Sequence, residues 1–70
     1  MRQGTMRHFD YERVAREAGI PEVDVGEIVQ AMRREFAGDD MLAELHVLRA
    51  CLAVRDRRVT LADVLGRRAA

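Results

Sequence analysis

The chain of 70 residues contains only one cysteine, one proline and two histidines, and it has no tryptophan. Because Cys51 is the single cysteine, no disulfide can form within the chain, and no set of cysteines and histidines has the spacing of a structural zinc site. In a domain of this size the core alone supplies only about 3–5 kcal/mol of stability. We therefore expect self-association to stabilise the fold further.

The residue patterns of an active site are also missing. The sequence has no serine to act as a nucleophile and no glycine-rich loop to hold a phosphate. Neither His8 nor His46 has a second histidine or a cysteine three or four positions away, as a metal site on a helix would need. Cys51 lies among leucine and valine residues and is expected to be a small buried hydrophobe. The sequence predicts no catalytic residue, no cofactor and no metal, and hence no enzyme.

Long apolar runs are absent as well. The N-terminal residues contain no apolar core of signal-peptide length, and the longest apolar-rich run, residues 41–54, is interrupted by Glu44, His46 and Arg49. The composition, 49% hydrophobic and 34% charged, is that of a folded globular protein. We expect a cytoplasmic protein without a membrane span.

All twelve basic residues are arginine, and they are unevenly placed although the formal net charge is zero. Residues 19–44 hold two arginines and seven acids, whereas residues 45–70 hold six arginines and two acids. A basic region can contact the phosphates of a nucleic acid. The candidates for such a contact are Arg55, Arg57, Arg58, Arg67 and Arg68. A solvated charged face explains the same run and is the favoured interpretation.

The spacing of apolar residues is helical throughout, and strand-like alternation does not persist. We expect helices near residues 11–18, 25–37, 40–56 and 61–65. The sequence thus predicts an all-α fold, a small bundle of three main helices with a short C-terminal helix. Within it we expect a flexible leader over residues 1–8, a single helical domain over 9–66 and a basic tail over 67–70.

Polar residues mark the start of each helix. Asp24 and Glu27 have the spacing of a capping box, flanked by Val23 and Ile28 as a hydrophobic staple, which predicts a helix beginning near Val25. The other predicted caps are Asp10, Asp39 or Asp40, and the pair Thr60 and Asp63. Glycines at positions 19, 38 and 66 follow helical segments, as left-handed terminating residues do.

The segment VAREAGIPEVDVGEIVQAM, residues 14–32, resembles the helix-turn-helix of lactose-repressor-type transcription factors. The resemblance lies in VAREAG at residues 14–19, in Ile20 at the turn, and in Val25 with Ile28-Val29 on the second helix. It covers nineteen of the seventy residues. It implies that Ala15 lets the two helices cross closely, that Gly19 makes the turn and that the second helix enters the major groove of DNA.

The charges in the same segment oppose that function. Glu22, Asp24 and Glu27 stand at the front of the second helix, and duplex DNA carries one negative charge per about 1.7 Å of its axis. A helix beginning at Val25 would also make the turn longer than the three or four residues of the motif. We expect no sequence-specific DNA binding through residues 21–32, and a structural helix hairpin is the favoured alternative.

The predicted third helix is apolar on two opposite faces. One, here the leucine face, consists of Met41, Leu45, Leu48 and Leu52. The other, here the small-residue face, consists of Ala43, Val47, Ala50 and Val54. We expect the other helices to cover the leucine face and leave the small-residue face exposed, where it would pair with a second copy.

These patterns together favour a small non-enzymatic cytoplasmic helical protein, an adaptor or regulatory module that acts by protein–protein interaction and self-association. The expected partners are a second copy of the chain, forming a homodimer through the small-residue face, and an unidentified protein. The alternative is a helix-turn-helix-type DNA-binding transcriptional regulator. Nucleic acid is therefore a candidate partner that is not favoured, and no membrane contact is expected.

Overall fold

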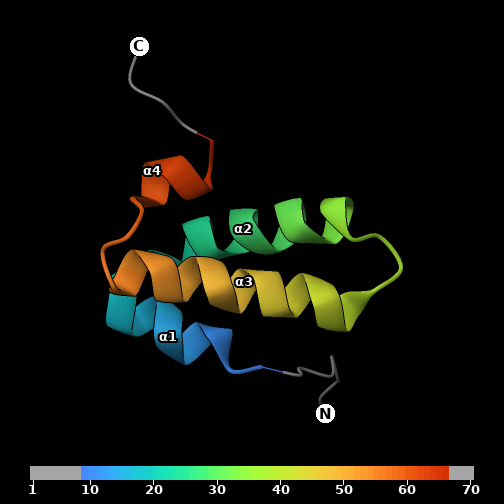
Figure 1. Ribbon diagram of the computed structural model, residues 1–70, viewed down its shortest axis with the longest axis horizontal. Coiled ribbons are helices and arrows are strands. Elements are labelled where there is room, and N and C mark those ends of the chain that lie inside the picture. The colour runs from blue at the N-terminus through green and yellow to red at the C-terminus, as the bar shows by residue number, and fades with distance from the viewer. Residues whose placement is uncertain (1–8, 67–70) are drawn as a thin grey trace.

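The computed structural model describes residues 9–66, which form four α-helices and no strand. The helices are α1 (Tyr11–Ala18), α2 (Glu22–Glu35), α3 (Asp40–Arg55) and the short α4 (Leu61–Val64), shown in Figure 1. The predicted all-α class, with three main helices and a short fourth, is confirmed. The predicted leader over residues 1–8 and tail over residues 67–70 lie outside the described residues.

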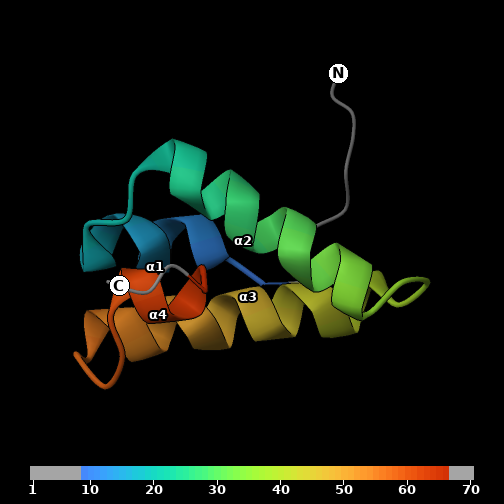
Figure 2. The ribbon, with the colours of Figure 1, turned by 90° about the horizontal axis from the view of Figure 1, so that it is seen from above.

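Helix α3 is the central element of the fold. Both α1 and α2 pack against it, whereas α1 and α2 make little direct contact with each other. In Figure 1 α3 runs between α2 and α1, and Figure 2 shows that α2 diverges from α3 toward its N-terminal end. Two helices that share one support in this way leave space between themselves.

The buried core is small and comes from the first three helices and the turn between α1 and α2. It consists of Tyr11, Val14, Ala15, Ile20, Ile28, Val47 and Cys51. The remaining apolar side chains of α2, α3 and α4 are only partly buried around this cluster. So small a core agrees with the limited stability that the chain length predicts.

The expected exposure of the small-residue face of α3 is wrong. Ala43 and Val47 are buried, at 2% and 1% exposure, and Ala50 and Val54 pack partly buried against the core. On the leucine face Met41 is 56% exposed, while Leu45, Leu48 and Leu52 are partly buried. Small side chains let neighbouring helices approach α3 closely, and α1 and α2 occupy that side. The small-residue face is therefore largely covered within one copy of the chain.

The predicted start of the second helix is also wrong. Helix α2 begins at Glu22 after Pro21, with no side-chain cap, and the backbone N–H groups of Asp24 and Val25 donate to the carbonyl of Pro21. Asp24 therefore lies inside the first turn, where acidic side chains favour the helix dipole. Val23 is 73% exposed, so it forms no staple with the buried Ile28.

The other predicted caps are confirmed. The Asp10 carboxylate accepts a hydrogen bond from the Arg13 N–H at 3.3 Å. The Asp39 carboxylate accepts one from the Leu42 N–H at 3.0 Å. Thr60 and Asp63 form a reciprocal capping box with bonds of 3.1 and 3.2 Å.

Replacing Asp39 by alanine is expected to lower the free energy of unfolding by about 1 kcal/mol, because the Leu42 N–H loses its acceptor. Asp40→Ala is the matched control, since this carboxylate lies next to the cap but acts only through the helix dipole. Chemical denaturation of both variants measures the difference. Equal loss of stability in the two would contradict the capping role of Asp39.

Candidate functional site

The connection between α1 and α2 is a turn of three residues, 19–21. Gly19 ends α1 in the left-handed conformation, with φ 75°, which glycine adopts without steric penalty. The Ile20 N–H donates to the Ala15 carbonyl at 2.9 Å, and the Ile20 side chain is buried in the core. The turn is therefore held rigidly at one end of the hairpin, from which the two helices separate.

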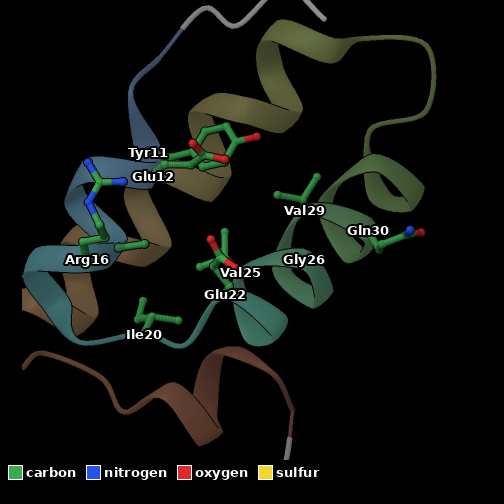
Figure 3. A pocket seen from close by; sticks show the side chains of 10 residues that line it. Tyr11, Glu12, Arg16, Ile20, Glu22, Val25, Gly26, Val29 and Gln30 are labelled. Atoms are coloured by element: carbon green, nitrogen blue, oxygen red, sulfur yellow. The ribbon is translucent and has the colours of Figure 1, made fainter.

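A hollow of about 460 Å³ lies between α1 and α2 (Figure 3). Its lining residues are Tyr11, Glu12, Ala15, Arg16, Ile20, Glu22, Val25, Gly26, Val29 and Gln30. Half of them are apolar side chains, contributed by both helices and the turn. We name this space the α1–α2 groove.

The polar side chains of the α1–α2 groove carry charges of both signs. Glu12 and Arg16 come from α1, and Glu22 and Gln30 come from α2. Arg16, Glu22 and Gln30 are exposed to solvent. The charges of the α1–α2 groove therefore do not favour a simple anion over a cation.

A second hollow of about 520 Å³ lies on the other side of α2, between this helix and α4. Its lining residues are Val23, Gly26, Glu27, Gln30, Ala31, Arg34, Val64 and Leu65. We name this space the α2–α4 groove. Because Gly26 and Gln30 line both grooves, α2 stands as a ridge between them.

Gly26 lies on that ridge, inside α2, where no contact within the fold requires a glycine. A Cβ atom built at this position meets no other atom within 4 Å. Glycine inside a helix is less stable than alanine by roughly 0.5–1 kcal/mol. Position 26 therefore faces open space, and a side chain there would touch no other part of the fold.

The predicted arginine contacts are only partly brought together. Arg55, Arg57 and Arg58 are exposed near the end of α3, and Arg57 has a left-handed φ of 62°. Arg67 and Arg68 lie outside the described residues. The Arg55 guanidinium donates to Glu17 at 3.0 Å and to Asp56 at 3.3 Å, and these hydrogen bonds raise its pKa. Arg55 thus joins α3 to α1 through an exposed ion pair.

His46 and Glu44 have surroundings of their own on α3. The His46 Nδ1–H donates to the Leu42 carbonyl at 3.0 Å, and the ring stacks on Phe36 with centroids 4.3 Å apart. Glu44 is buried at 4% exposure. Among residues 9–66, no group of three histidine, cysteine or acidic side chains is arranged to hold a metal ion.

The sequence analysis predicted neither groove. Tyr11 and Ala15 on α1, and Val25 and Val29 on α2, lie at the helical spacing of ordinary core-facing residues, and only the angle between the two helices decides that they line a groove. The sequence does contain one signal for this region, because Gly26 is an isolated glycine within a helical pattern.

No family model matches the chain, and no curated protein or solved structure is significantly similar to it. Within the described part, none of the four helices is long and apolar enough to cross a membrane.

Cys51 lies fully buried in the core, and this burial raises the pKa of its thiol. Because a raised pKa keeps the thiol protonated near neutral pH, we expect iodoacetamide to alkylate the native protein slowly. In denaturant the same thiol should react at the rate of an exposed cysteine. Mass spectrometry of timed samples measures both rates, and equal rates would show that Cys51 is accessible.

Proposed function

We propose that the chain is a small non-enzymatic, cytoplasmic helical module that acts by protein–protein interaction, including self-association, and that α2 is its contact element. The observation that carries this proposal is the position of α2 as an exposed ridge between two grooves. Val23, near the start of the ridge, is 73% exposed, the largest value among the exposed large hydrophobic side chains in residues 9–66.

Two further properties of the fold support a contact function. The core is so small that it contributes little stability to a single copy of the chain. Binding of a partner to the native state would add stability. Apolar surface flanked by polar side chains is typical of association sites. The sequence predicts a contact surface on α3, whereas the contact surface proposed here lies on α2.

The proposal predicts a mass above that of the monomer, rising with concentration, in sedimentation equilibrium at micromolar to millimolar protein. Val23→Gln should weaken the association, since it removes an exposed apolar side chain from the ridge. Met41→Gln is the control, because Met41 is also exposed but lies on α3, away from the ridge. A monomer at every concentration would refute self-association.

DNA binding by a helix-turn-helix is a second candidate function, favoured by one observation. The turn between α1 and α2 has three residues, 19–21, as the motif requires, and not the longer turn that the sequence suggested. The charges still oppose it, because Glu22 and Glu27 are exposed at the front of α2 and would face the phosphates.

We expect no shift of generic duplex DNA by the unmodified protein in a mobility assay at low salt. Reversal of both exposed acids, by Glu22→Arg with Glu27→Arg, should create weak binding that disappears as salt is raised. Protection of a defined DNA site by the unmodified protein, lost when α2 is substituted, would instead establish the helix-turn-helix function.

A further inference from the structure

Helix α3 is covered by the other helices on one side only. Helices α1 and α2 pack against the side that holds its buried residues, which are Ala43, Glu44, Val47 and Cys51. In Figure 2, α1, α2 and α4 all lie on the same side of α3, and no described helix lies on the opposite side. The residues about half a helical turn away from the buried ones therefore point out of the fold.

This opposite side of α3 is mostly apolar. We name it the outer face of α3, and it consists of Met41, Leu42, Leu45, Arg49 and Ala53. Met41 is 56% exposed, and the other three apolar side chains are partly exposed. Within the described part of the chain, none of these four is among the apolar side chains that pack against the core. The outer face is therefore apolar surface that the core of the fold does not use.

Arg49 lies in the middle of the outer face and is the only charged residue among its five. The side chain is exposed, and it has no ion pair with any described residue. Its neighbours one turn away on this face are Leu45 and Ala53. Beyond the end of α3, Arg57 and Arg58 are exposed as well. An apolar surface with an unpaired arginine at its centre is complementary to a partner that offers apolar side chains and a carboxylate.

The same arginine argues against a second copy of this chain as the occupant. Helix α3 has 16 residues and Arg49 is close to its middle, so a twofold pairing of two outer faces brings both copies of Arg49 near the symmetry axis. Two unpaired arginines at that position repel each other. The self-association proposed on α2 therefore uses a different surface from this one.

The shape of the outer face fits an α-helix. A row of residues at intervals of four runs along it, namely Met41, Leu45, Arg49 and Ala53. At roughly 1.5 Å per residue, this row is about 18 Å long. The backbone N–H and C=O groups in the middle of α3 are bonded within the helix, so an extended peptide finds no free edge to pair with. A helix of about three turns covers such a row by packing its own side chains between these.

We propose that the outer face of α3 binds an amphipathic helix of another protein, with an apolar stripe against Met41 and Leu45 and an acidic side chain paired with Arg49. This inference goes beyond the self-association proposed on α2, because it gives the chain a second contact surface and states the chemistry of the partner that the surface accepts.

Two synthetic helical peptides test the charge. Both carry leucines along one face, and the flanking positions are glutamate in one peptide and lysine in the other. Fluorescence anisotropy should show that the glutamate peptide binds, more weakly as salt is raised, and that the lysine peptide binds at least about tenfold more weakly. Arg49→Glu should reverse this preference. Arg33→Glu makes the same charge change at an exposed position of α2 and should leave the preference unchanged.

Two apolar variants separate the outer face from the ridge of α2. Met41→Gln should weaken binding of the glutamate peptide and leave self-association unchanged, because it removes apolar contact area from α3 only. Val23→Gln should have the opposite pair of effects. Peptide titration and sedimentation equilibrium of the same samples measure both, and circular dichroism confirms that each variant is folded.

Each result has one meaning. Reversal of the preference by Arg49→Glu, but not by Arg33→Glu, supports the outer face as a binding site for an acidic amphipathic helix. A protein that binds neither peptide, or that still prefers the glutamate peptide after Arg49→Glu, overturns this inference whether or not the chain self-associates. Loss of self-association in Met41→Gln also overturns it, because a second copy then covers the outer face. A monomeric protein that binds the glutamate peptide through Arg49 refutes the proposed self-association alone.

Discussion

The packing of α1 and α2 on one narrow side of α3 is the constraint on which the rest of this structure depends. That side is built from Ala43, Val47 and Cys51, which are almost completely buried. Their small size lets two helices approach the same support. If larger residues covered this side, α1 and α2 would be held farther out and the small core could not close.

The grooves follow from that packing. Helices α1 and α2 are tied to each other by a turn of three residues and to α3 by the core, but they touch each other little. Ile20 anchors the turn in the core, and α2 diverges from α3 toward that end (Figure 2). The α1–α2 groove is thus a consequence of supporting two helices on one, whereas the α2–α4 groove also depends on where α4 lies.

Electrostatics then limit what the ridge can bind. Acidic side chains in the first turn and basic ones in the last turn suit the dipole of α2 itself. The acidic side chains at the front of the helix oppose contact with DNA phosphates there. The ion pair between Arg55 and Glu17 has a different role, because it ties the end of α3 to α1.

The sequence by itself determined the helical class, the number of helices and most of their ends. Apolar spacing, the capping residues Asp10, Asp39 and Thr60, and the glycines that end helices are local signals, and local hydrogen bonds satisfy them. The predicted start of α2 is wrong. Asp24 and Glu27 have the spacing of a capping box, but the helix already begins at Glu22, directly after Pro21.

Only the tertiary structure decided which residues of α3 are most deeply buried. Both faces of α3 are apolar, so periodicity could not choose between the leucine face and the small-residue face. The choice depends on how closely α1 and α2 can approach, which is a property of three helices together and of the turn that joins two of them. The α1–α2 groove arises from the same angles and has no counterpart in the spacing of residues along the chain.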